Sequence, residues 1–110
     1  MACSYADFAE PTNPAVVTYL EGRGPLLSKG LPPLKVAYEL FVGRTQLDLI
    51  GYGLLRGEPD ALHVRWLIPD IQLRLQDGRV LELSITELHG GIAYAEMTAI
   101  PKWLLPRRRA

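Results

Sequence analysis

Carboxylates are the side chains of this 110-residue chain that could most readily do acid–base chemistry. Two carboxyl groups held together in a cleft can serve as general acid and general base. The spacing of the carboxylates along the chain does not favour a catalytic pair over separate, solvated charges. The carboxylates that interrupt apolar runs are most simply explained by outward-facing positions on strands. A small-ligand barrel or enzyme with carboxylates in its lumen is therefore an alternative, and we expect no catalytic residue. The candidates for such a pair are Asp48, Asp70, Glu82, Glu87 and Glu96.

Nucleophilic, metal and nucleotide chemistry have weaker signals in the sequence. No serine stands in a nucleophile-elbow sequence, and the Gly-Tyr-Gly segment 51–53 lacks the last glycine and the following helix of a dinucleotide fingerprint. His63 and His89 are the only histidines, and Cys3 is the only cysteine. A structural zinc site needs four converging nitrogen or sulfur ligands, which this composition cannot supply. We expect no metal and no cofactor, and we lean towards a protein that is not an enzyme.

Residues 100–110, IPKWLLPRRRA, carry the clearest hint of a binding function. Three consecutive arginines after a proline form a local positive end on a chain of zero formal net charge. Arginines neutralise nucleic-acid phosphates, so contact with nucleic acid is one alternative; an anionic membrane surface is another, less favoured. The simplest interpretation is a solvated tail anchored by Trp103. The residues that would contact an acidic partner are Lys102, Arg107, Arg108 and Arg109.

Length and composition limit the class of protein. A chain of 110 residues with 48% apolar residues forms one domain with its own core. One cysteine excludes a disulfide framework, and no apolar run approaches the roughly 20 residues of a membrane span. The first residues lack the pattern of a signal peptide. We therefore expect a cytoplasmic protein without a membrane partner.

The elements that must position these side chains are predicted to be strands. Alternating apolar residues indicate strands at 14–21, 34–42, 47–55, 61–68, 71–75, 81–85 and 92–100, and the Gly/Pro-rich stretch 22–33 indicates a connection. Over 61–68 the parity places Leu62, Val64, Trp66 and Ile68 inward and His63 and Arg65 outward. A short helix is predicted over 4–10, and residues 87–105 could form strand or helix.

The hairpin around Asp77-Gly78 is the strongest single structural signal. A two-residue turn would place Leu73 opposite Glu82, a carboxylate against a core leucine. One extra residue beside Gly78 removes this conflict, because a one-residue slip reverses every side chain. We therefore predict a bulge, with the pairs Leu75–Leu81, Leu73–Leu83, Ile71–Ile85 and, outside, Arg74–Glu82.

These strands predict an all-β fold, or α+β with one short helix, built as a small antiparallel barrel or sandwich of six or seven strands. Doubly wound α/β folds are excluded because the gaps between strands are too short for crossover helices. We expect one domain over residues 1–110. It comprises an extended N-terminal segment 1–33, a β core 34–100 and a basic C-terminal tail 101–110.

Surplus apolar residues provide the remaining clue to function. A small barrel buries one face of each strand, yet the segment 47–55 is apolar on both faces. The extra surface must be covered by the N-terminal segment or by another chain. We therefore expect a non-enzymatic binding or assembly module that contacts a protein partner or itself, as a homodimer. The interface would include Phe41, Ile50, Tyr52, Leu54, Arg65 and Leu67.

Overall fold

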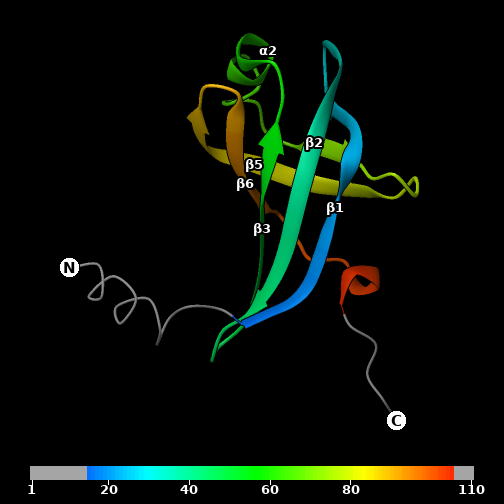
Figure 1. The fold of residues 1–110 in the computed structure, drawn as a ribbon, viewed down its shortest axis with the longest axis vertical. Coiled ribbons are helices and arrows are strands. Elements are labelled where there is room, and N and C mark those ends of the chain that lie inside the picture. Colours follow the sequence, from blue (N-terminus) through cyan, green and yellow to red (C-terminus); the bar gives the residue numbers. More distant parts are fainter. Residues whose placement is uncertain (1–14, 106–110) are drawn as a thin grey trace, which may run out of the picture.

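Apolar residues at alternate positions close the chain into an antiparallel barrel of six strands (Figure 1). The computed structural model describes residues 15–105. The strands follow the order β1-β2-β3-β6-β5-β4 around the barrel, which confirms the predicted all-β fold and selects the barrel over the sandwich. The elements are β1 (Ala15–Ser28), β2 (Leu31–Arg44), β3 (Leu49–Arg56), α2 (Pro59–His63), β4 (Ile71–Arg74), β5 (Val80–His89), β6 (Ile92–Met97) and the 3-10 helix η1 (Lys102–Leu104).

These elements decide one question that the sequence left open. Residues 87–105 contain the end of β5, all of β6 and the short η1, so strand is the main regular structure in this stretch. The helix predicted over 4–10 lies outside the described residues. Within 15–105 the one α-helix is α2, which spans a single turn and part of another.

The hairpin between β4 and β5 contains the predicted extra residue, but its strands pair differently from the prediction. The Leu75 N–H donates to the Arg79 carbonyl (2.7 Å), and the Gly78 N–H donates to the Leu75 carbonyl (2.9 Å). Gly78 has φ 95°, which makes this a three-residue loop with a glycine bulge.

The observed register lies two residues from the predicted one. Leu73 pairs with Leu81 and Ile71 with Leu83, whereas Arg74 faces Val80 and not Glu82. The tighter loop adds ladder hydrogen bonds close to the turn. A shift of two residues keeps every side chain on its face, so the apolar pairing that motivated the prediction is retained.

Residues 61–68 do not form the predicted strand. Glu58 caps a helix there, since its side chain accepts a hydrogen bond from the Ala61 N–H (2.8 Å), and Pro59 occupies the first turn. A capping residue followed by proline is a helix-start signal that outweighs the alternation of the next residues. After α2 the chain continues as turns, with Arg65 buried instead of outward and Val64 and Trp66 exposed instead of inward.

The Gly/Pro-rich stretch 22–33 is also mostly strand, not a connection. β1 continues to Ser28, the chain turns at Lys29-Gly30, and β2 begins at Leu31. Gly24 is required by close approach: a Cβ atom at this position would lie 2.0 Å from the Arg74 carbonyl oxygen. This approach lets β1 reach β4 and close the barrel through the pairs Leu26–Leu73 and Leu27–Gln72.

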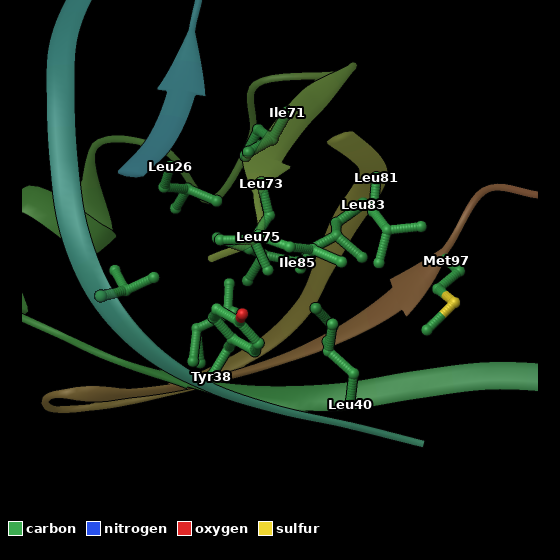
Figure 2. Close-up of a cluster of buried hydrophobic side chains, with 14 of the residues drawn as sticks. Leu26, Tyr38, Leu40, Ile71, Leu73, Leu75, Leu81, Leu83, Ile85 and Met97 are labelled. Atoms are coloured by element: carbon green, nitrogen blue, oxygen red, sulfur yellow. The ribbon is translucent and has the colours of Figure 1, made fainter. Parts of the chain in front are cut away.

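The barrel interior is filled by apolar side chains. Figure 2 shows Leu75 and Ile85 of the hairpin side pointing across the lumen towards Tyr38 and Leu40 of β2. Full burial of such side chains contributes about 1.5–3 kcal/mol each. The buried hydrophobic residues are Leu26, Val36, Tyr38, Leu40, Val42, Leu55, Leu62, Ile71, Leu73, Leu75, Leu81, Leu83, Ile85, Ala93, Ala95, Met97 and Leu104.

Strands β1, β2 and β3 extend beyond the closed barrel (Figure 1). β1 pairs with β4 only at Leu26 and Leu27, and with β2 along almost its whole length. The start of β3, residues 49–51, pairs with β2 alone, because the ladder with β6 starts at Tyr52. The three strands thus form a ribbon whose outer face and open edge are the surfaces of interest below.

Candidate interaction surfaces

A row of aromatic side chains crosses the outer side of the ribbon. Tyr19, Phe41 and Tyr52 occupy paired positions on β1, β2 and β3. The Tyr19 and Phe41 ring centroids lie 5.0 Å apart at 45°, and the Phe41 and Tyr52 centroids lie 5.2 Å apart at 15°. These separations are typical of interacting aromatic pairs. The row lies outside the barrel because the neighbouring residues Leu40 and Val42 face the core.

Apolar residues extend this row along β3 and across to β6. Ile50 and Leu54 flank Tyr52 on the same side of β3, and Leu54 pairs with Tyr94 of β6. The side chains at the margin are open to solvent, with 46% of Tyr19 and 41% of Tyr94 exposed. We call this surface the aromatic face. Its members are Tyr19, Phe41, Ile50, Tyr52, Leu54 and Tyr94.

Acidic side chains surround the aromatic face. The Tyr19 hydroxyl donates to Glu21 (2.9 Å), and this hydrogen bond raises the pKa of Tyr19. Arg56 donates to Glu39 (2.8 Å), and this bond, with the attraction of the two charges, raises the pKa of Arg56. Glu96 pairs with Tyr52 across β3 and β6. The tyrosine therefore stays neutral, and carboxylates lie close to its ring and to that of Tyr52.

The structure brings four of the six predicted interface residues together. Phe41, Ile50, Tyr52 and Leu54 all lie on the aromatic face. Tyr19 and Tyr94 join them but were absent from the prediction. Outward parity relative to buried neighbours would have identified Tyr94, whereas the row formed by Tyr19 depends on the β1–β2 register, which the sequence leaves open.

Arg65 is not on this surface. Only 3% of Arg65 is exposed. Its guanidinium donates to the Ala61 carbonyl (2.7 Å) and to the Pro32 carbonyl, so it links α2 to the start of β2. Burial lowers the pKa of this group. Arg65 therefore has a structural role, and its contact with β2 lies far along that strand from Phe41.

Leu67 lies in the turns after α2 and is 88% exposed. Val64 and Trp66 of the same segment are also exposed. They form a second, smaller apolar surface near the opposite end of β2 from the aromatic row. The structure therefore does not bring residues 65–67 together with residues 41–55, as the sequence predicted.

A groove of 780 Å³ borders the aromatic face. One wall is the start of β3, and the opposite wall is the end of β6 with the chain that follows it. Met97 lies at its base, where Gly51 leaves room: an added Cβ at Gly51 would lie 2.4 Å from the Met97 sulfur. We call this the edge groove. Its lining residues are Asp48, Leu49, Ile50, Gly51, Tyr52, Glu96, Met97, Thr98, Ala99, Ile100 and Leu105.

The candidate carboxylates all lie on the outside of the barrel. Glu82, Glu87 and Glu96 project from the outer sides of β5 and β6, and Asp48 and Asp70 stand in turns. The lumen is occupied by the apolar core, so a lumenal acid–base pair finds no support among the described residues. Asp48 and Glu96 do come together as lining residues of the edge groove. Sequence spacing missed this because Asp48 precedes β3 and Glu96 lies on β6, and only the closed barrel defines how these two strands pair.

The C-terminal segment is anchored through its apolar residues. Leu104 is buried beneath the barrel, and the Trp103 ring lies 4.4 Å from the Arg79 guanidinium in a cation–π contact. Lys102 is exposed in η1. The other members of the predicted basic cluster, Arg107, Arg108 and Arg109, lie outside the described residues.

Residues 15–105 hold no group of three or more His, Cys, Asp or Glu side chains that could bind a metal ion. None of the helices in that range is long and apolar enough to cross a bilayer. Comparison with protein families, with curated proteins and with solved structures finds no match for this chain.

Proposed function

We propose that this chain is a non-enzymatic binding or assembly module that uses its aromatic face to contact a protein partner, in the simplest case a second copy of itself. The observation that supports the proposal is the row Tyr19–Phe41–Tyr52 with its apolar neighbours on the outside of the barrel. The cytoplasmic setting expected from the single cysteine belongs to the same proposal.

The fold itself does not require these side chains. Each strand buries its inner residues in the lumen, so the barrel is complete without Phe41, Ile50 or Tyr52. Contiguous exposed apolar surface on a protein marks a contact site, and tyrosine and phenylalanine are enriched in the centres of protein interfaces. The aromatic face combines both properties on one side of a rigid sheet.

The charges around the face favour a protein over a nucleic acid. Exposed aromatic rings on a sheet can stack on nucleic-acid bases, but the adjoining backbone phosphates need cations. Glu21, Glu39 and Glu96 stand beside the rings, and Arg56 is bound to Glu39. Arg23 and Lys35 lie beside Glu21 and Glu39 further along the same side, where the charges are mixed. The carboxylates next to the rings disfavour a phosphate backbone stacked across them. The nucleic-acid alternative then relies on the arginines at 107–109.

A second copy can meet the apolar centre of this surface through a twofold axis. A twofold interface uses the same patch on both partners, which requires a surface that is complementary to itself. The stacked rings of Phe41 and Tyr52 form the flat, apolar centre of such a patch, and polar residues such as Glu21 form its rim.

Sedimentation velocity of the full chain over a range of concentrations tests the proposal. We expect a concentration-dependent dimer that is lost in the double variant Tyr19→Ser, Phe41→Ser. A matched control, Ser84→Ala on the outer side of β5, should sediment like the wild type. Circular dichroism and thermal melting verify that each variant is folded. A wild-type chain that sediments as a monomer at every concentration would contradict self-association.

A further inference from the structure

We infer that the edge groove binds an extended peptide with alternating basic and apolar side chains, which joins the sheet as an additional strand beside β3. The inference rests on the proposed function as a binding module and gives the chemistry of a partner at the surface next to the aromatic face. It is carried by three features of the groove: its open backbone edge, its apolar base and its unbalanced acidic charge.

The backbone edge is open because β6 turns away from β3. The ladder between them ends at Tyr52–Glu96, and Met97 pairs with Leu83 of β5. The next residue continues in that direction, since the Thr98 N–H donates to the Glu82 carbonyl (3.1 Å). Residues 49–51 are left with β2 as their only neighbour in the described sheet. An exposed strand edge of this kind accepts an added strand through backbone hydrogen bonds.

The base of the groove is apolar. Met97, Ile100 and Leu105 lie beneath the edge of β3 together with Leu49. The volume of 780 Å³ falls within the range of protein binding sites. A strand laid along β3 would direct every second side chain onto this base and the others towards solvent, because strand side chains alternate with period two.

The charge of the groove selects a basic partner. Asp48 and Glu96 are its charged lining residues, and none of the residues from 15–105 that line it is Lys, Arg or His. The Leu49 N–H donates to Asp48 Oδ1 (2.7 Å), which holds this carboxylate at the start of β3. Lysine or arginine side chains on the solvent side of an added strand would lie close to these carboxylates.

The same charges disfavour a second copy as the occupant. If two copies paired antiparallel along β3, the carboxylates of Asp48 and Glu96 in one copy would face those of the other. Like charges that face each other across an interface suppress association. The groove is therefore assigned to a peptide of different sequence, and the aromatic face to self-association.

Selection of phage-displayed random octapeptides on the full chain tests the inference. We expect the selected sequences to alternate basic with apolar residues and to bind, by fluorescence anisotropy, about tenfold or more weakly to the variant Asp48→Lys, Glu96→Lys. A matched reversal on the outer side of β5, Glu82→Lys, Glu87→Lys, should change affinity by less than about twofold. Selected peptides without basic residues, or equal losses in both variants, would overturn the inference.

Backbone methylation separates strand addition from simple charge attraction. N-methyl groups on alternate residues of a selected peptide should abolish binding when they occupy the edge that faces β3, and leave it intact in the other register. Equal binding in both registers would refute an added strand. Peptide binding that emerges only after removal of residues 106–110 would also refute it, because the chain's own arginines would then be the occupant.

Failure of this inference can be told apart from failure of the proposed self-association. The double variant Tyr19→Ser, Phe41→Ser changes no residue that lines the groove. A wild-type monomer that still binds the peptides would refute self-association and retain the groove. Because Ile50 and Tyr52 belong to both surfaces, peptide binding is also measured on the Tyr19→Ser, Phe41→Ser monomer. A wild-type dimer with no peptide binding in either form would retain self-association and refute the groove.

Discussion

One row of paired residues crosses five strands of the sheet and changes character halfway. On the ribbon side it consists of Tyr19, Phe41 and Tyr52, and on the hairpin side it continues with Glu96 and Ser84. The inner side of the sheet is apolar throughout. The two halves of the barrel therefore share one apolar core, but the outer surface of one half is apolar and that of the other is polar.

This contrast separates the side chains that the fold requires from those that it does not require. In β5 the outward residues Glu82 and Ser84 alternate with buried leucines, which is the pattern of a sheet with one face in water. In β3 the outward residues are as apolar as the inward ones. A barrel folds with the first pattern, so the second indicates a surface that meets something other than water.

Replacement of a core leucine on the hairpin side should have the largest effect. Leu83 is fully buried, and Leu83→Ala should lower the free energy of unfolding by about 2–5 kcal/mol through lost burial and a cavity. Leu47→Ala in the exposed β2–β3 turn is the matched control and should change it by less than about 0.5 kcal/mol. Urea denaturation measures both. Equal losses would mean that the hairpin side does not carry the core.

The second largest effect is expected where β1 of the ribbon packs against β4 and closes the barrel. Gly24→Ala should cost about 1–3 kcal/mol, because the new methyl group would meet the Arg74 backbone. Gly22→Ala should cost less, since its Cβ would meet the ends of two side chains, Gln76 and the Tyr38 hydroxyl, and no backbone atom. Thermal unfolding ranks the two variants. A larger loss for Gly22→Ala would place the barrel closure elsewhere.

Loss of the aromatic row should affect stability less than it affects association. Phe41→Ser should lower the free energy of unfolding of the monomer by about 1–2 kcal/mol, because Phe41 is half-buried between two rings. Ser84→Ala, in the polar half of the row, should remain within about 0.5 kcal/mol of the wild type. Denaturation of dilute samples gives both values, and a Phe41 loss near that of Leu83 would make it a core residue.

The smallest effect concerns pH at the hairpin turn. The Arg79 N–H donates to Asp77 Oδ1 (2.9 Å), and this bond, with the nearby Arg79 charge, lowers the pKa of Asp77 from its usual 3.8. A lowered pKa in the folded state contributes stability above the unfolded pKa, and this contribution is lost as pH falls through the folded value. The stability difference between wild type and Asp77→Asn should therefore shrink below about pH 4. Urea midpoints against pH check it, and a constant difference would contradict it.

The parts of the fold that could be predicted are those with a local pattern. Parity in the β4–β5 hairpin demanded an extra residue, and the two-faced apolar pattern of 47–55 indicated an outer apolar surface on β3. The prediction for residues 61–68 was wrong because their alternation hides a helix start at Glu58-Pro59. The prediction for 22–33 was wrong because Gly22 and Gly24 serve close packing within a strand, and only Gly30 serves a turn.

The surfaces were harder to predict than the strands. Parity accounts for the four predicted members of the aromatic face and also for Tyr94, but the place of Tyr19 in the row depends on how β1 pairs with β2. The edge groove joins residues 48–52 with 96–105, and this proximity exists only once the barrel has closed. No local sequence pattern indicates where the hydrogen-bond ladder between two strands ends.

Oxidative footprinting at low and high protein concentration tests the central claim most directly. Tyr19, Tyr94 and Trp66 are exposed to similar extents, 46%, 41% and 38%, but only the two tyrosines belong to the aromatic face. We predict that oxidation of Tyr19 and Tyr94 falls as the concentration rises, while oxidation of Trp66 stays constant. Oxidation of the two tyrosines that does not depend on concentration, or protection of Trp66 instead, would contradict the assignment of the aromatic face as the contact surface.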